Sequence, residues 1–161
     1  MTDYERLLKV LDVAGVQFIV IGGFAAILHG SAQLTEDLDV VYARVPQNIE
    51  RLVKALAPLH PYLRGAPPGL PFLWDAETIH RGLNFTLTTD SGDFDVLGEI
   101  AGGGTYDDLL PDSNKVRIFG VDCQVLGLRR LIQAKRAAGR PKDFQAVAEL
   151  ERILEEQDST D

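Results

Sequence analysis

Several residue types that build common functional sites are scarce in this sequence. Cys123 is the only cysteine among 161 residues, so no disulfide can form within the chain. The three histidines, at positions 29, 60 and 80, share no spacing typical of metal ligands. Basic residues are outnumbered, because 16 Lys and Arg oppose 24 Asp and Glu, for a net charge of −8. That balance argues against a protein whose whole surface binds nucleic acid.

Long hydrophobic runs are missing as well. The longest apolar stretch, residues 16–28, contains Gln17 and two glycines and is too short to span a bilayer. No basic segment precedes it, so we expect no signal peptide and a cytoplasmic protein. With 45% hydrophobic and 25% charged residues, the composition is that of a globular domain large enough for a core of its own.

One stretch near the N-terminus organises the rest of the chain. An apolar run of strand type at 18–21 ends at Gly22-Gly23, a small apolar helix is expected at 24–28, and a second strand at 37–42. The paired glycines have no side chains, so a phosphate could approach the backbone and the start of the following helix.

Asp37 and Asp39 begin the second strand. Side chains alternate along a strand, so both carboxylates project to one face, roughly 6.6 Å apart along the backbone, while Leu38 and Val40 face the other way. Two like charges on an apolar strand repel and lose hydration unless a cation lies between them. Mg²⁺ would supply that cation, since one or two carboxylates, water and substrate phosphates usually complete its coordination.

The pattern resembles the signature of the nucleotidyltransferase superfamily, the polymerase-β-like group. The matching residues are Ile21-Gly22-Gly23, then thirteen residues, then Asp37-Leu38-Asp39-Val40. The resemblance implies an α/β (α+β) fold, a small mixed sheet flanked by helices with a short helical C-terminus. It also implies transfer of a nucleoside monophosphate from an NTP to an acceptor hydroxyl, with Mg²⁺ bound by the aspartates. Gly22, Gly23 and Ser31 would bind the nucleotide.

The same resemblance requires a third carboxylate on a neighbouring strand. Residues 83–88 and 93–97 alternate as a hairpin, and Asp93 and Asp95 share one face of its second strand. We assign Asp95 as the third catalytic and metal-binding residue, because it lies within the apolar run. Asp93 lies at the turn, where a solvated hairpin residue is the simpler interpretation.

A local reversal of charge follows near the C-terminus. Residues 129–142 contain six basic residues and no acidic one, which suits a triphosphate or an RNA backbone, although a solvated helix face is the alternative. Lys135 continues the apolar stripe of Leu128, Leu131 and Ile132. It therefore either extends to the rim or reaches an anionic ligand, and we expect it to bind the nucleotide.

The segment 135–143, with its Gly-Arg-Pro-x-Asp run, resembles small bacterial standalone nucleotidyltransferases, some of them AbiEii-like toxins. Many of those relatives carry a basic residue shortly before the Asp-x-Asp pair, where this chain has Gln33. We expect a nucleotidyltransferase core over 1–127, a C-terminal helical pair packed on it over 128–156, and a frayed tail over 157–161. Residues 58–71, with five prolines and two glycines, are expected to be an ordinary connector rather than a wall of the acceptor pocket.

Two questions stay open at this level. The acceptor could be tRNA, a protein side chain or a small molecule. A second function class is a non-catalytic interaction module, such as half of a toxin–antitoxin pair with an antitoxin as partner. Three intact carboxylates count against that alternative, because a retired site has no physical reason to keep clustered like charges.

Overall fold

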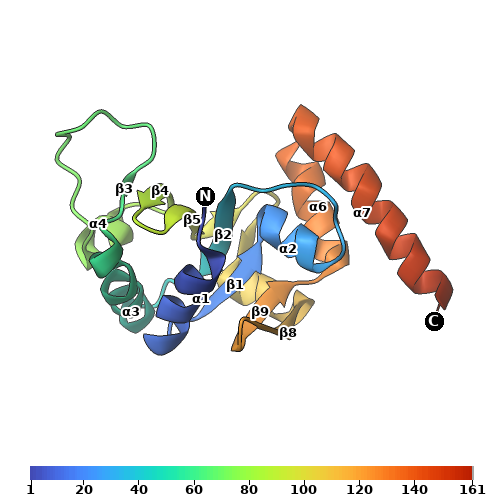
Figure 1. The fold of residues 1–161 in the computed structure, drawn as a ribbon, viewed down its shortest axis with the longest axis horizontal. Coiled ribbons are helices and arrows are strands. Elements are labelled where there is room, and N and C mark those ends of the chain that lie inside the picture. Colours follow the sequence, from blue (N-terminus) through green and yellow to red (C-terminus); the bar gives the residue numbers. More distant parts are fainter. Residues whose placement is uncertain (161) are drawn as a thin grey trace.

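The computed structural model describes residues 1–160 and has a mixed seven-stranded sheet flanked by helices, which confirms the expected fold class (Figure 1). The helices are α1 (Tyr4–Val13), α2 (Gly22–Leu28), α3 (Pro46–Leu56), α4 (Ala76–Arg81), α5 (Tyr106–Leu109), α6 (Leu128–Ala138) and α7 (Pro141–Thr160). The sheet contains β1 (Phe18–Ile21), β2 (Asp37–Tyr42), β3 (Tyr62–Leu63), β4 (Asn84–Thr89), β5 (Gly92–Leu97), β8 (Ser113–Ile118) and β9 (Val121–Leu126). A separate small ribbon pairs β6 (Glu99–Ile100) with β7 (Gly104–Thr105).

The strand order is β3-β4-β5-β2-β1-β9-β8. The hairpin expected from residues 83–97 is present as β4 with β5, and β8 pairs with β9 in a second hairpin. β2 lies at the centre, antiparallel to β1 and parallel to β5. The central position matters because β2 carries Asp37 and Asp39, so neighbouring strands can add side chains to their face.

The other face of β2 and β5 is the hydrophobic core. Leu38, Val40 and Phe94 alternate with the aspartates and are fully buried. They belong to one apolar cluster with Leu8 of α1 and Leu52 of α3. Burying a side chain of this size contributes about 1.5–3 kcal/mol, so this packing fixes which face of the strands carries the carboxylates.

The proline-rich segment after α3 does more than connect two elements, which corrects the expectation for residues 58–71. Its Tyr62 and Leu63 form β3 and pair antiparallel with Thr88 and Leu87 of β4, so they extend the sheet. Figure 1 shows the chain after β3 as a long loop that stands away from the sheet.

The chain ends in the expected pair of helices. Gly139 ends α6 in the left-handed conformation, with φ of 65°, and Pro141 begins α7. Ion pairs from Arg129 to Asp158 and from Arg136 to Glu151 join α6 to α7. The tail expected to fray at 157–161 is helical as far as Thr160, and Asp161 lies outside the described residues. Within residues 1–160, no helix has the length and apolar character needed to cross a membrane.

Candidate active site

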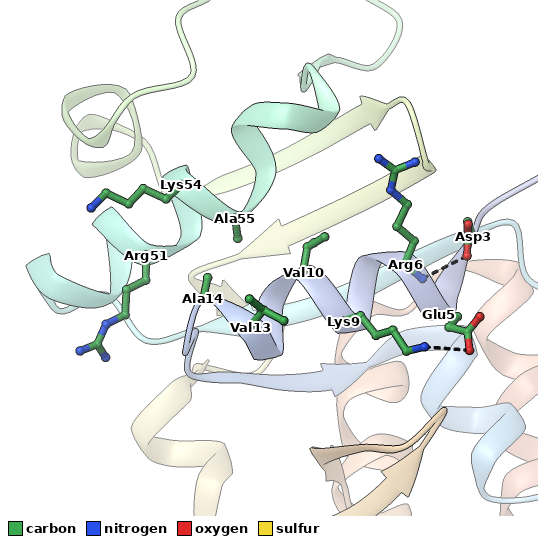
Figure 2. A pocket seen from close by; sticks show the side chains of 10 residues that line it. All are labelled: Asp3, Glu5, Arg6, Lys9, Val10, Val13, Ala14, Arg51, Lys54 and Ala55. Atoms are coloured by element: carbon green, nitrogen blue, oxygen red, sulfur yellow. Dashed lines mark hydrogen bonds and ion pairs between the residues drawn. The ribbon is translucent and has the colours of Figure 1, made fainter.

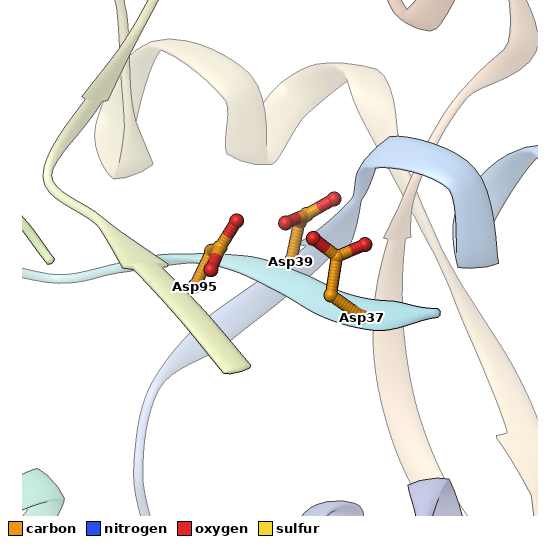
Figure 3. Close-up of side chains that lie close together, drawn as sticks. All are labelled: Asp37, Asp39 and Asp95. Atoms are coloured by element: carbon orange, nitrogen blue, oxygen red, sulfur yellow. The ribbon is translucent and has the colours of Figure 1, made fainter. Parts of the chain in front are cut away.

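Three aspartates converge on one face of the sheet. β2 and β5 run parallel with Asp39 opposite Asp95, and Asp37 precedes Asp39 by two residues on the same face. Each of the three offers one oxygen within 4.8 Å of the others (Figure 3). Among the described residues, this is the only group of three or more His, Cys, Asp or Glu side chains that could hold a metal ion. A set of carboxylate oxygens suits Mg²⁺, Mn²⁺ or Ca²⁺.

The pKa of the Asp39 carboxyl is strongly perturbed. Burial raises its pKa to about 8, and a hydrogen bond with Asp95 and the nearby charge of Asp37 act in the same direction. At neutral pH and without a metal ion, these effects therefore favour the protonated form of Asp39, with Asp95 as its hydrogen-bond partner. The crowding expected from the sequence is real, and a proton relieves it when no cation is bound.

Gly22 and Gly23 are required by packing within the protein, independently of any bound ligand. Gly22 has φ of +68°, and a Cβ there would overlap the Asp39 carboxylate. A Cβ at Gly23 would lie 2.7 Å from Thr35 Oγ1. Thr35 in turn donates from that oxygen to Asp37 Oδ1 at 3.3 Å. The start of α2 can therefore approach the aspartate strand closely only because both positions lack a side chain.

Arg64 reaches the same carboxylates, and the sequence analysis did not identify it. Its Nη2 donates to Asp95 Oδ1 at 2.6 Å, and its Nη1 lies 3.7 Å from Asp37 Oδ2. Its Nε lies 3.5 Å from Asp93 Oδ2, so Asp93 belongs to an ion-pair network instead of being only solvated. The proline-rich segment around Arg64 has no helical or strand periodicity, so the direction of this side chain could not be predicted from the sequence.

The aspartates lie in a cleft of about 510 Å³ that also has a cationic wall. The basic residues lining it are Lys135 of α6, Arg140 of the α6–α7 junction and Lys142 of α7. Burial lowers the pKa of the partly buried Lys135, and the charges of Asp143 and Asp39 oppose that shift. As expected from its helical phase, Lys135 faces the cleft, whereas Arg129 and Arg136 pair with α7 as described above.

Arg140 is a second cation that sequence reasoning missed. The buried Asp143 holds its guanidinium through Oδ2, which accepts from Arg140 Nε at 2.7 Å, and through Oδ1, which accepts from Nη2 at 3.2 Å. The hydrogen bond to Asp143 is the largest cause of the raised pKa of Arg140. The negative charges of Asp39 and Asp37 act in the same direction. The sequence analysis used the Gly-Arg-Pro run for the family resemblance and counted Arg140 among the basic residues of 129–142, without assigning it a contact of its own.

Gly22, Gly23 and Ser31 also line this cleft. Ser31 is buried, and its Oγ donates to Glu149 Oε1 of α7 at 2.5 Å. The backbone N–H of Ala32 donates to the other oxygen of Glu149 at 3.0 Å. Ser31 thus ties the segment before β2 to α7, and its expected role in nucleotide binding stays a prediction.

A larger groove, of about 710 Å³, lies between α1 and α3 (Figure 2). Apolar, basic and acidic side chains line it. The apolar ones are Val10, Val13, Ala14 and Ala55, the basic ones Arg6, Lys9, Arg51 and Lys54, and the acidic ones Asp3 and Glu5. The two acidic residues are already engaged, Asp3 as the cap of α1 and Glu5 in an ion pair with Lys9. Size alone therefore does not locate the reactive site, and the carboxylate cleft is the better candidate.

No family model and no curated protein matches the chain. Several chains of solved structures are similar to it, including the following two. A candidate nucleotidyltransferase from Thermotoga maritima is 17% identical, with a TM-score of 0.57, and the match covers 94% of this chain and 89% of that one. The lincosamide antibiotic adenylyltransferase LnuA, solved with lincomycin bound, is 14% identical, with a TM-score of 0.59, and the match covers 94% and 98%. The chain has the nucleotidyltransferase fold. At these identities the similarity establishes the fold and leaves the activity to be argued from the site.

Proposed function

We propose that this chain is a metal-dependent nucleotidyltransferase, which transfers a nucleoside monophosphate from an NTP to an acceptor hydroxyl and releases pyrophosphate. The convergence of Asp37, Asp39 and Asp95 in one cleft carries the proposal. The cationic wall opposite them and the fold shared with LnuA support it. The carboxylates would hold divalent ions, with Mg²⁺ as the expected metal, because their donor atoms are all hard oxygens.

The remaining groups of the cleft suit a triphosphate. The start of α2 at Gly22 and Gly23, two residues without side chains of their own, would offer backbone N–H groups to a phosphate. Ser31 would add a hydroxyl, and Lys135 and Arg140 would offset the negative charge of the β- and γ-phosphates. When bound, the metal would stabilise the charge that develops on the reacting phosphoryl group and on the leaving pyrophosphate.

The bonds that change are few. The acceptor hydroxyl oxygen forms a bond to the α-phosphorus, and the bond from that phosphorus to the β-bridging oxygen breaks. Pyrophosphate leaves with the electron pair of the broken bond. Asp95 would take the proton of the acceptor hydroxyl, because it lies on β5, on the opposite side of β2 from β1 and the glycines that follow it.

The acceptor is proposed only by class. LnuA is an adenylyltransferase of a lincosamide antibiotic, so a hydroxyl of a small molecule is one candidate acceptor for this chain. A tRNA end and a protein side chain are the other two. An AbiEii-like role as a toxin, with an antitoxin as partner, and a cytoplasmic location stay predictions from the sequence.

Label transfer tests the proposal. The protein, Mg²⁺ and each NTP labelled at the α-phosphate are incubated with a cell extract that is then separated into RNA, protein and small molecules. We expect label in one fraction, none with γ-labelled NTP, and none with Asp39→Asn. Asp122→Asn, which alters an exposed aspartate of β9, is the control and should label normally. Transfer from the γ position, or equal labelling by Asp39→Asn, would refute the proposal.

A further inference from the structure

Within residues 1–160, Arg64 is the one cation that forms ion pairs with Asp37 and Asp95, and the proposed reaction assigns it no role. Its guanidinium lies against one oxygen of Asp95, at 2.6 Å, and one oxygen of Asp37, at 3.7 Å. The planar guanidinium has five N–H donors, so it can contact two carboxylates at once.

The sheet itself sets the position of this guanidinium. The backbone N–H of Arg64 donates to Thr86 O of β4 at 2.9 Å, continuing the pairing of β3 with β4. Thr86 is in turn opposite Asp95, so Arg64, Thr86 and Asp95 form a row across the sheet. The Arg64 Nη2 also donates to Leu87 O at 2.7 Å. These anchors are backbone groups of β4, and they do not depend on the state of the aspartates.

Both aspartates also have partners other than Arg64. Asp37 Oδ1 is near Thr35 Oγ1, at 3.3 Å, and Asp95 is hydrogen-bonded to Asp39. Asp39 itself makes no ion pair with Arg64 among the described residues. Arg64 therefore engages the carboxylates from the β4 side and leaves the side around Asp39 to other ligands.

We propose that Arg64 is a positioning residue, which fixes Asp95 and Asp37 so that their remaining oxygens, with Asp39, receive a divalent cation. It stays in place when the metal binds, because its backbone anchors on β4 are unaffected. The inference rests on the proposed metal-dependent function. The opposite arrangement is a plug, in which the guanidinium occupies the metal position and must leave. The two make opposite predictions for metal affinity.

Mn²⁺ binding to the full chain, followed by the electron paramagnetic resonance signal of the free ion, distinguishes them. The variants are Arg64→Met, Arg64→Lys and, as control, Arg117→Met. Arg117 is an exposed arginine that also pairs with an aspartate of a neighbouring strand, Asp122, at 3.2 Å. We expect Arg64→Met to bind Mn²⁺ at least about tenfold more weakly, the usual effect of losing a group that orients metal ligands. Arg64→Lys should fall between it and wild type, since an ammonium cannot contact Asp95, Asp37 and Leu87 O together.

Tighter binding by Arg64→Met would establish the plug and overturn the inference, and unchanged binding would overturn it too. If Arg64→Met does not fold, as judged by circular dichroism, Arg64→Lys decides: weaker binding supports the inference and wild-type binding overturns it. If the wild-type chain binds no Mn²⁺, the proposed metal-dependent function fails, and the inference fails with it. Wild-type binding with no loss in the Arg64 variants overturns the inference alone.

Discussion

The Asp39 carboxylate occupies the space that a side chain on residue 22 would need. A Cβ on residue 22 would overlap the Asp39 carboxylate, and the backbone of Gly22 has φ of +68°. The glycine that follows β1 and begins α2 is therefore a steric requirement of the aspartate on the neighbouring strand. The Gly-Gly pair and the Asp-x-Asp pair of the motif are therefore in direct contact within the protein itself, without a bound nucleotide.

A methyl group at position 22 should therefore disable the site more than it destabilises the fold. Gly120 has φ of +78° and nothing within 4 Å of its Cβ position, so Gly120→Ala is a control with similar backbone strain, roughly 1–2 kcal/mol. We expect Gly22→Ala to lose this amount and, in addition, metal binding and turnover, because Asp39 must move. Urea unfolding and Mn²⁺ titration of both variants measure the two effects. Equal metal affinity in the two variants would show that Asp39 tolerates the displacement.

Asp39→Asn should be more stable than wild type when no metal is present. The pKa of Asp39 is raised from 3.8 to about 8 in the folded chain, so between these values the folded state holds more protons than the unfolded state. Wild-type stability therefore falls as pH rises from about 4 to about 8, and the substitution removes that loss.

Unfolding in urea with EDTA, at pH 5 and pH 8, measures this difference. The advantage of Asp39→Asn should be larger at pH 8 and reach at least about 1.4 kcal/mol, the equivalent of one pKa unit. Asp122→Asn serves as the exposed control and should show no such trend. A variant less stable than wild type at pH 8 would mean that Asp39 has a structural role.

Metal affinity should depend on pH for the same reason. Below pH 8 a divalent cation must displace the proton on Asp39, so binding releases a proton and strengthens as pH rises. We expect Mn²⁺ affinity to rise by up to about tenfold per unit between pH 6 and pH 8, as one-proton competition requires, and then to level off. Isothermal titrations in buffers of different ionisation enthalpy also count the protons released. A flat profile from pH 6 to 8 would contradict the prediction.

The parts of the site that could be predicted from the sequence are those that local pattern determines. Alternation along 37–42 set the shared face of Asp37 and Asp39, and the hairpin turn before β5 set the phase of Asp95. The strand runs are apolar and short, so their burial follows from the local pattern, although the ends of β4 and β5 differ by one residue from the expected bounds. The double glycine was recognised, but the reason given was phosphate approach, whereas its immediate contacts are Asp39 and Thr35.

The remainder depends on pairing between distant segments. β3 has only two residues, too few for any periodicity, and its pairing with β4 brings Arg64 to the carboxylates. Arg140 lies in a helix interruption, where no face can be assigned, and only the packing of α7 brings Asp143 and the junction to the cleft. The order of the strands likewise follows from tertiary packing, which a single sequence does not reveal.

Lys135 should bind the β- and γ-phosphates of the nucleotide. It is partly buried in the cleft, where burial lowers its pKa, so a bound triphosphate would restore the favourable environment that its ammonium lacks. Lys135→Ala should weaken NTP binding by about 1.5–3 kcal/mol, the usual scale for a hydrogen bond to a charged group. Lys135→Arg should recover only part of this, because a planar fork places its charge differently from an ammonium. Calorimetric titration of NTP into both variants measures the loss, with Lys115→Ala, an exposed lysine of β8, as control. Unchanged affinity in Lys135→Ala would leave this lysine as a side chain that only packs along the rim, and Arg140 would become the main candidate for the phosphate contact.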